Sequence, residues 1–498
     1  MKKFVCFVLI AMILIGSFPI VASATGPSNY TYGYNEWSVP IASPDAYRVS
    51  DYILGQHLQY EGQSIGAFRT PQDLHVVGNL LYIVDSGNNR ILIMQFNEDT
   101  TFEVIDIKTF ATYENGEQTE FRNPYGIYVS EWEASEGQIW IADRNNQRVL
   151  HLDEDWNVLN VMLHPGIHGT SLLSETSDFL PEKIAVDFSG RLFVQTDGVN
   201  RGLMEFDRYG NFAGYMGAPP VEVSIIDQFW RFIATPEQRA RMPLNVPVEY
   251  NNLYIDHEGF IFVTTSSDGV SPVSRLNAMG EDILIRNGWF EPIGDIWWGT
   301  GANISGPSVF IDVTALPNNI YIVFDRNRGR LFAYDTQGEL LYAWGGPGNR
   351  EGYFTFATAI DSMGYTLFAL DAGNSGSLTR FDLTEYGLLI NQALDMYQRG
   401  LYEESYEVWN DVLRINGNFG LAYLGIARAR LRQGQYREAM EYFKDQNDYR
   451  NYGRAFGFYR RIWMEQNFWM FALALGVLMI VPPVVRKVIK VRREIRES

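Results

Sequence analysis

Cysteine is almost absent from this sequence of 498 residues: the single one, Cys6, lies inside an apolar N-terminal run. Disulfides, thiol catalysis and cysteine-bound zinc are therefore excluded from the rest of the chain. Histidine is scarce too, with six residues, and the pair His164 and His168 encloses Pro165-Gly166, which interrupts a helical metal site. GxSxG, HExxH and GxxxxGK[ST] motifs are also missing. The sequence thus carries no common hydrolase, metalloprotease or phosphate-loop signature.

Positive charge is in short supply as well. Lys and Arg number 40 against 59 Asp and Glu, which gives a formal net charge of −19. Because binding to nucleic acid depends on neutralising phosphates with basic side chains, no nucleic-acid partner is expected.

Long apolar runs occur only near the two ends of the chain. At the N-terminus Lys2-Lys3 precede such a run, and Ala22-Ser23-Ala24 supplies the small residues that a signal peptidase requires. We interpret residues 1–24 as a signal peptide, so the protein is expected to be exported. The short lysine-led signal and the lack of cysteine favour a bacterial surface protein.

The second apolar run covers residues 468–485, close to the roughly 20 residues that cross a bilayer. It is followed by six cations: Arg486, Lys487, Lys490, Arg492, Arg493 and Arg496. The positive-inside rule places this end in the cytoplasm. We therefore predict a single-pass cell-membrane protein with extracellular N-terminal domains, a transmembrane helix at 466–485 and a basic cytoplasmic tail at 486–498. Pro482-Pro483 are expected to break the helix near its inner end.

Between residues 68 and 387 a β-rich unit recurs about every 40 to 60 residues, which is the spacing of propeller blades. The core of the unit is a strand, a second strand ending in Asp, a polar turn with Asn and Arg, and further strands. The match is close in the first two units and partial in others, and the fourth unit, with TTSSDGVSPVSR, departs from it. Six units can be counted, but the sixth lacks its last strand. Residues 46–60 are expected to supply it, because closing the ring removes an unpaired sheet edge. The prediction is a mainly β fold, a six-bladed β-propeller over 46–387, followed by an α part.

The polar turns resemble those of NHL-repeat propellers. The residues that carry the resemblance are Asp85, Asn88, Arg90, Asp143, Asn146, Arg148, Asp325 and Arg330. A strand-ending aspartate can accept hydrogen bonds from the following turn, so the motif is interpreted as structural. Calcium is the one ion that these aspartates could hold, and no cofactor is otherwise expected.

In an up-and-down blade these turns lie at the same end as the link into the next blade, around the mouth of the channel. The residues that open the innermost strands are expected at the same mouth: Gln72, Asp73, Tyr125, Glu182, Lys183, Asn251, Asn252 and Ser308. This polar ring is our candidate ligand-binding site, and a solvated mouth is the alternative. The long link at 221–243 has apolar residues at helical spacing, which predicts a helical lid or a packing insertion on this face.

Beyond residue 387 the pattern becomes helical. The segments YQRGLYEESYEVW and LRQGQYREAMEYF align without gaps and place Gly400 and Gly434 34 residues apart. This spacing resembles tetratricopeptide repeats, in which such a glycine permits close helix packing. We assign residues 388–465 to a tetratricopeptide-like segment that serves either as a stalk or as a peptide receptor.

The expected function is a membrane-anchored extracellular scaffold that presents a propeller face and helices to a protein or small-molecule partner, such as a neighbouring membrane complex. The alternative is a tethered hydrolytic propeller. Resemblance to amidating lyases would imply a metal near His75, the one histidine placed on an innermost strand. Resemblance to calcium-dependent lactonases would imply a site from Glu182, Asn251 or Asn252, with Asp73. Neither match extends to a motif.

Overall fold

The computed structural model describes residues 31–97, 100–165, 179–218, 232–235, 248–266, 271–296, 306–373 and 376–497. The chain divides into two compact units, and residues 34–46 group with the helical unit that begins at residue 383. Residues 47–382 belong to the β unit. The predicted signal peptide lies outside the described residues, as does the 221–243 link apart from residues 232–235.

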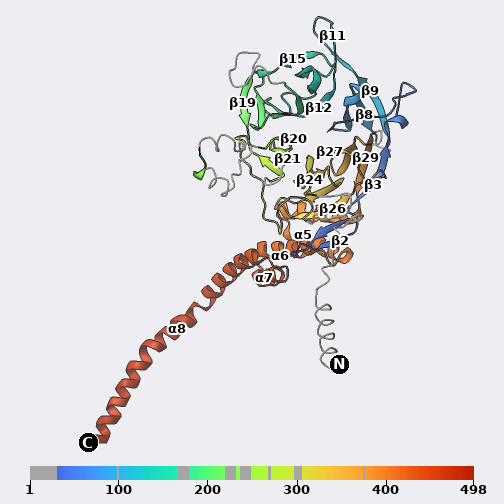
Figure 1. The fold of residues 1–498 in the computed structure, drawn as a ribbon. Coiled ribbons are helices and arrows are strands. Elements are labelled where there is room, and N and C mark those ends of the chain that lie inside the picture. The colour runs from blue at the N-terminus through green and yellow to red at the C-terminus, as the bar shows by residue number, and fades with distance from the viewer. Residues whose placement is uncertain are drawn as a thin grey trace, which may run out of the picture. The chain divides into compact units, whose positions relative to one another are not determined.

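The β unit is a six-bladed propeller built from antiparallel sheets whose strands follow one another in sequence (Figure 1). Blade 1 contains β6 (Asp73–Val77), β7 (Leu80–Asp85), β8 (Arg90–Phe96) and β9 (Phe102–Lys108). Blade 2 contains β12 (Pro124–Val129), β13 (Ile139–Asp143), β14 (Arg148–Leu152) and β15 (Val158–Met162). Blade 3 contains β16 (Pro181–Val186), β17 (Leu192–Thr196), β18 (Leu203–Phe206) and β19 (Phe212–Met216).

The second half of the ring is less regular. Blade 4 contains β20 (Tyr250–Ile255), β21 (Ile261–Thr265) and β22 (Val273–Leu276) among the described residues. Blade 5 contains β23 (Phe310–Ala315), β24 (Tyr321–Asp325), β25 (Arg330–Tyr334) and β26 (Leu340–Gly345), and β1 (Tyr32–Tyr34) pairs with β26. Blade 6 contains β27 (Ala357–Met363), β28 (Thr366–Asp371) and β29 (Ser377–Leu383). Small hairpins are formed by β4 (Gln59–Tyr60) with β5 (Gln63–Ser64), and by β10 (Phe110–Thr112) with β11 (Gln118–Glu120).

An N-terminal strand completes blade 6, as the sequence predicted. β3 (Tyr47–Ile53) lies beside β29 as the outermost strand of that sheet (Figure 1). A strand from the opposite end of the chain thus closes the ring, and β29 is left without an open edge.

The hydrophobic core lies between neighbouring blades, because each second and third strand is apolar on both faces. One cluster joins Leu81 and Ile83 of blade 1 to Phe368 and Leu370 of blade 6, all of them buried. Other clusters join blade 1 to blade 2, and blades 2, 3 and 4 to one another. Burial against two neighbours explains why these strands are continuous apolar runs rather than alternating ones.

The helical unit contains β2 (Pro40–Ala42) and the helices α4 (Glu385–Gln398), α5 (Tyr402–Ile415), α6 (Gly420–Arg432) and α7 (Tyr436–Asp445). The hydroxyl of Thr384 accepts the N–H of Gly387 at 3.2 Å, so it caps the start of α4. Ser405 and Ala439, at equivalent positions of α5 and α7, are completely buried. The two helical hairpins that the sequence predicts are therefore present.

The predicted role of Gly400 and Gly434 in helix packing is wrong. Both follow the end of a helix with φ near +80°, and a Cβ added at either position would meet no atom closer than 4.0 Å. They stop α4 and α6 in the left-handed conformation that glycine adopts at helix ends. The glycine that permits a close approach is Gly425 of α6, whose Cα faces the buried indole of Trp409.

Replacing Gly425 with alanine is expected to destabilise the helical unit by about 1–3 kcal/mol, because the added methyl would overlap the Trp409 ring. Gly453 of the following helix provides a matched control, since a methyl there meets nothing within 4 Å. Gly453→Ala is expected to stabilise by about 0.5–1 kcal/mol through helix propensity. Chemical unfolding of both variants measures the difference, and equal effects would contradict the packing.

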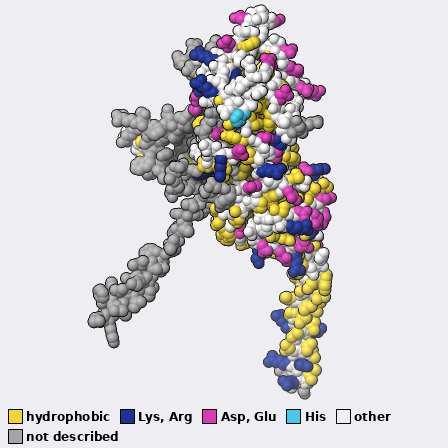
Figure 2. All heavy atoms as spheres, turned by 90° about the vertical axis from the view of Figure 1, so that its right-hand side faces the viewer, with side chains coloured by type: hydrophobic (Ala, Val, Ile, Leu, Met, Phe, Trp, Pro, Cys, Tyr) yellow, Lys and Arg dark blue, Asp and Glu magenta, His cyan; other side chains and the backbone are white. Residues whose placement is uncertain are grey.

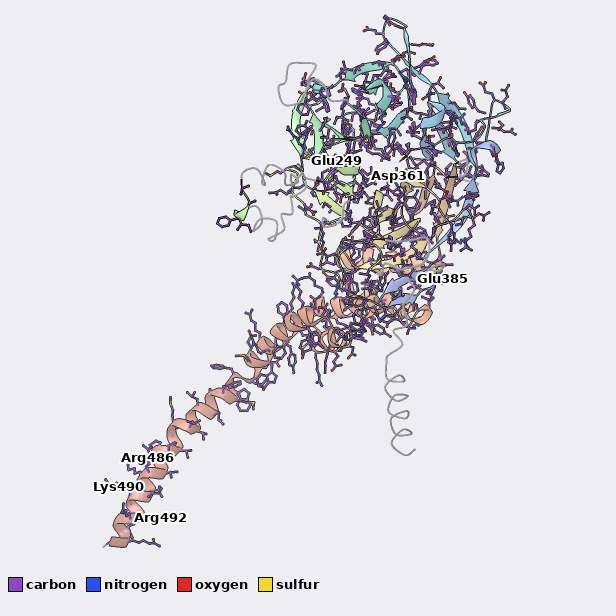
Figure 3. The ribbon with its side chains drawn as sticks, in the orientation of Figure 1. Glu249, Asp361, Glu385, Arg486, Lys490 and Arg492 are labelled. Carbon is purple, nitrogen blue, oxygen red and sulfur yellow. The ribbon has the colours of Figure 1, made fainter. Side chains whose placement is uncertain are left out.

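The last helix, α8 (Tyr449–Glu497), is 49 residues long. Among the described residues it is the one helix long and apolar enough to span a membrane, and its most apolar window is not buried. Figure 2 shows hydrophobic side chains along it and basic side chains towards its end, where Figure 3 labels Arg486, Lys490 and Arg492. The helix continues through Pro482 and Pro483, so the predicted break is absent. Prolines are tolerated in membrane helices when the freed backbone groups find other partners.

Candidate ligand-binding face around the propeller channel

The motif at Asp85 connects the turn after the second strand, through hydrogen bonds, to the segment that leads into the first strand of the same blade. The Asp85 carboxylate accepts the N–H of Arg69 at 2.7 Å, the Asn88 amide at 2.8 Å and Arg90 Nε at 2.7 Å. Arg90 also donates to the carbonyl of Ile65 at 2.8 Å. Since Asp85 is completely buried and its oxygens are occupied, the motif fastens the backbone and leaves little capacity for a ligand.

Blade 2 repeats this arrangement. The Asp143 carboxylate accepts the N–H of Arg122, the Asn146 amide and Arg148 Nε, each at 2.8 Å. The residue that ends each turn has a left-handed backbone: it is Asn89 in blade 1, with φ of 52°, and Gln147 in blade 2, with φ of 53°. Both turns lie next to the segment that leads into the innermost strand, at one end of the propeller.

Blades 5 and 6 keep the aspartate but change its partners. Asp325 accepts the N–H of Val309 at 3.0 Å, whereas Arg330 pairs with Asp295 at 2.6 Å. Asp371 accepts the N–H groups of Thr355 and Phe356 at 3.0 and 2.6 Å. The strand-ending aspartate therefore fastens the incoming segment in all four blades that carry it.

A β-bulge determines which residues surround the channel mouth. The pairing of the two innermost strands shifts by one residue in blades 2 to 6, at Pro124/Gly126, Pro181/Lys183, Tyr250/Asn252, Phe310/Asp312 and Ala357/Ala359. A bulge leaves one residue unpaired and redirects its side chain. The bulged residues are Tyr125, Glu182, Asn251, Ile311 and Thr358. Three of the predicted mouth residues, Tyr125, Glu182 and Asn251, therefore occupy equivalent positions.

Tyr125 and Glu182 belong to a charged cluster that joins blades 2 and 3. Arg144 donates to Glu182 at 3.1 Å and to Asp197 at 2.8 Å, and its guanidinium lies 5.5 Å from the centre of the Tyr125 ring. Burial raises the pKa of the Glu182 carboxyl, and Arg144 acts in the opposite direction. Burial also raises the pKa of Tyr125.

The innermost strands of blades 1, 3 and 4 contribute three further side chains that bind neighbours in the channel, Asp73, Lys183 and Asn252. Lys183 Nζ forms an ion pair with Asp73 and donates to the carbonyl of Gln72 at 3.3 Å. Asn252 donates to Asp312, a residue that was not among the predicted mouth residues. Because all four side chains are buried with partners, they form a cross-channel network.

Two predicted residues have structural partners instead. The Asn251 amide donates to the carbonyl of Phe310 at 2.8 Å, which ties blade 4 to blade 5. Ser308 precedes β23 rather than opening it, and its hydroxyl accepts the N–H of Asp295 at 3.1 Å. Ile311 and Asp312 take the positions in blade 5 that correspond to Glu182 and Lys183 in blade 3.

A second layer of the network surrounds Asp361, which lies in β27 (Figure 3). Asp361 accepts the N–H of Val76 at 2.8 Å and the Thr314 hydroxyl at 3.2 Å, and it lies 3.5 Å from His75 Nδ1. His75 Nε2 contacts the carbonyl of Val129 at 3.0 Å. The signal in the sequence was an aspartate inside each of two apolar strands, FIDVTA and ATAIDSM.

These carboxylates share one geometry. Asp73 accepts the N–H of Ile127, Asp312 that of Ile360 and Asp361 that of Val76, at 2.8 to 2.9 Å. Each bond links the innermost strand of one blade to that of the next, including blade 6 to blade 1. Among the described residues no three His, Asp or Glu side chains converge to hold a metal ion. Because the three backbone hydrogen bonds run from blade to blade, the carboxylates help to hold the ring closed.

Two of the channel groups have displaced pKa values. Burial raises the pKa of Asp312 to about 7, although Lys183 and backbone N–H groups oppose the shift. Burial alone would lower the pKa of His75, but the hydrogen bond to Asp361 and its charge raise the pKa overall. Both groups therefore hold their protons more tightly in the folded propeller than in the unfolded chain.

Propeller stability is expected to fall as the pH rises. The contribution of Asp312 is fully present below its unfolded pKa of about 4 and is lost as the pH rises through about 7. That of His75 is fully present below its unfolded pKa of about 6.5 and is lost as the pH rises through its higher folded pKa. Thermal unfolding at a series of pH values from about 5 to 8 should show a falling Tm, with a shallower slope in Asp312→Asn. Identical slopes in the two proteins would contradict the role of Asp312.

No protein-family model and no curated protein matches this chain. Among solved structures it is similar to virginiamycin B lyase from Staphylococcus aureus, with 11% identity, 68% of this chain and 100% of that chain covered, and a TM-score of 0.40. The Malassezia sympodialis allergen Mala s 1 matches with 11% identity, coverage of 67% and 97%, and a TM-score of 0.41. The extracellular domain of a one component system from B. thetaiotaomicron matches with 14% identity, coverage of 62% and 32%, and a TM-score of 0.32. These similarities assign no activity to this chain.

Proposed function

We propose that this protein is a membrane-anchored extracellular scaffold that presents a rigid propeller to a partner. The observation that carries the proposal is the apolar part of α8, where Phe468, Leu478 and Ile480 each expose more than 60% of their surface. In water such a surface would be strongly unfavourable, whereas a bilayer of about 30 Å accepts it. Trp463 and Trp469 flank its start, as aromatic residues do at membrane interfaces.

The orientation follows from charge. Six basic residues follow the apolar segment within 486–498, and the N-terminal apolar run is an export signal in our interpretation. Both features support an orientation with the propeller and the helical hairpins outside the cell and the C-terminus in the cytoplasm.

The scaffold role is supported by the channel side chains, which bind one another. Asp73 binds Lys183, and Asn252 binds Asp312, so two of the groups that a lactonase-like site would need are held by protein partners. A hydrolytic metal-dependent propeller therefore gains no support, and we do not propose one. The partner in this account is a protein or a small molecule, such as a component of a neighbouring membrane complex.

Removing the anchor is expected to release the protein from membranes. A chain ending at Glu465 should appear in the soluble fraction, whereas the full chain should sediment with membranes and resist alkaline carbonate. A chain ending at Val485, which keeps the apolar segment but loses the basic tail, is the matched control and should stay in the membrane. Extraction of the full chain by carbonate would contradict the proposal, because a spanning helix is not removed by salt or alkali.

A further inference from the structure

Two arginines at the channel mouth occupy equivalent positions in different blades. Arg144 follows the strand-ending Asp143 in blade 2, and Arg326 follows Asp325 in blade 5. Blades 2 and 5 lie three places apart in the six-membered ring, so the two arginines face the mouth from opposite sides. They differ in the side chains that the next blade places beside the guanidinium.

Arg144 is satisfied by the next blade. Glu182, the bulged residue of blade 3, lies 3.1 Å away, and Asp197, which follows the second strand of that blade, lies 2.8 Å away. Both carboxylates bind one guanidinium, which leaves Arg144 little capacity for another anion.

The blade after Arg326 lacks both carboxylates. Strand register aligns Thr358 of blade 6 with Glu182, because each is the bulged residue of its innermost strand. Ala372 follows Asp371 as Asp197 follows Thr196, so it takes the second position. The Thr358 hydroxyl donates to the carbonyl of Leu370 at 3.2 Å. Blade 6 therefore presents no anion where blade 3 presents two.

Arg326 consequently makes no ion pair within the described part of the protein, although the chain has a formal net charge of −19. Arg326 is an exposed residue as a whole, and its guanidinium lies 5.2 Å from the centre of the Phe356 ring, which is itself 45% exposed. Burial lowers the pKa of the Arg326 guanidinium, and Tyr125 and Glu182 across the mouth oppose that shift, although Glu182 itself is bound by Arg144. A planar cation next to an exposed aromatic ring is a complementary surface for an anion with an apolar body.

We propose that Arg326 and Phe356 form a binding site for a carboxylate attached to an aromatic or apolar group. The carboxylate would take the two-pronged position on the guanidinium that Glu182 and Asp197 take on Arg144, and the apolar body would lie against the Phe356 ring. The site is independent of the membrane anchor, so its failure would leave the proposed scaffold orientation untouched.

Benzoate is the probe for this site, and benzamide is its neutral counterpart of the same shape. Binding to the full chain in nanodiscs is measured by ligand-observed NMR. We expect saturable binding of benzoate and at least about tenfold weaker binding of benzamide, since the charge-assisted hydrogen bonds are lost. Arg326→Gln should weaken benzoate binding by about tenfold or more.

A second variant tests the site without removing the arginine. Thr358→Glu combined with Ala372→Asp restores the two carboxylates of blade 3, so Arg326 should be paired internally and benzoate binding lost. Arg208→Gln is the matched control, because Arg208 is an exposed arginine 5.3 Å from the ring of Tyr209 in a β18–β19 turn. Binding should be unchanged in that variant. No saturable benzoate binding, or equal binding in Arg326→Gln and the unmodified chain, would overturn the proposal.

Discussion

Replacing Asp143 with alanine is expected to lower the free energy of unfolding of the propeller by about 3–5 kcal/mol. The carboxylate is completely buried and binds Arg148 and Asn146 as well as the N–H of Arg122. Alanine would leave the largely buried Arg148 guanidinium without its counter-charge, which costs more than the hydrogen bonds themselves. Urea unfolding followed by tryptophan fluorescence measures the loss.

The control for this prediction is Asp207, a turn aspartate whose carboxylate accepts two backbone N–H groups, those of Tyr209 and Asn211, at 2.9 and 2.8 Å. It lies in an exposed turn and holds no arginine, so Asp207→Ala is expected to cost only about 1 kcal/mol. If both substitutions had equal effects, Asp143 would be an ordinary turn residue and the interpretation of the repeat motif would fail.

Replacing Arg380 with alanine is expected to cost about 2–3 kcal/mol by weakening the closure of the ring. The buried guanidinium contacts Asp51 of β3 at 2.6 Å and Asp382 of β29 at 2.5 Å, and it lies 4.8 Å from the Phe96 ring of blade 1. It thus connects the closing strand, the last blade and the first blade. The expected loss is smaller than that for Asp143, because Asp51 and Asp382 are both partly exposed to solvent.

Arg380→Lys keeps the charge but loses the planar fork, and it should fall between the wild type and alanine. A chain without residues 47–53 removes the closing strand altogether and exposes the edge of β29. Light scattering should then detect association of the chains, since an unpaired edge recruits other strands. A monomeric deletion variant as stable as the full chain would show that the ring does not depend on β3.

The blade pattern could be predicted because it repeats. Asp85 and Asp143 each end a strand and bind side chains only three and five residues further along the chain. Because these partners are close in sequence, the turn can be recognised from the sequence alone. The closing strand was predicted for a similar reason: the sixth unit stopped one strand short, and a ring with an open edge is unfavourable. The 34-residue spacing also predicted the helical hairpins, although Gly400 and Gly434 serve as helix ends.

The channel network could be predicted only in part. Tyr125, Glu182 and Lys183 open their strands and were identified from position, but a bulge decides which neighbour faces the channel, and the sequence does not mark it. Asp312 and Asp361 were missed because each acts on the backbone of the next blade. The distinction between Arg144 and Arg326 likewise depends on residues that lie 38 and 53 positions away from Arg144 and become neighbours only in the ring.

The orientation of the chain in the membrane is the central claim, and single-cysteine labelling tests it most directly. Cys6 is the only cysteine, so a Cys6→Ser chain has no background thiol. Tyr209→Cys places a thiol on the propeller at a residue 70% exposed, and Ile495→Cys places one beyond the apolar segment at a residue 69% exposed. In intact cells a membrane-impermeant maleimide should label Tyr209→Cys, and it should label Ile495→Cys only after permeabilisation. Labelling of Ile495→Cys but not Tyr209→Cys in intact cells would contradict the account.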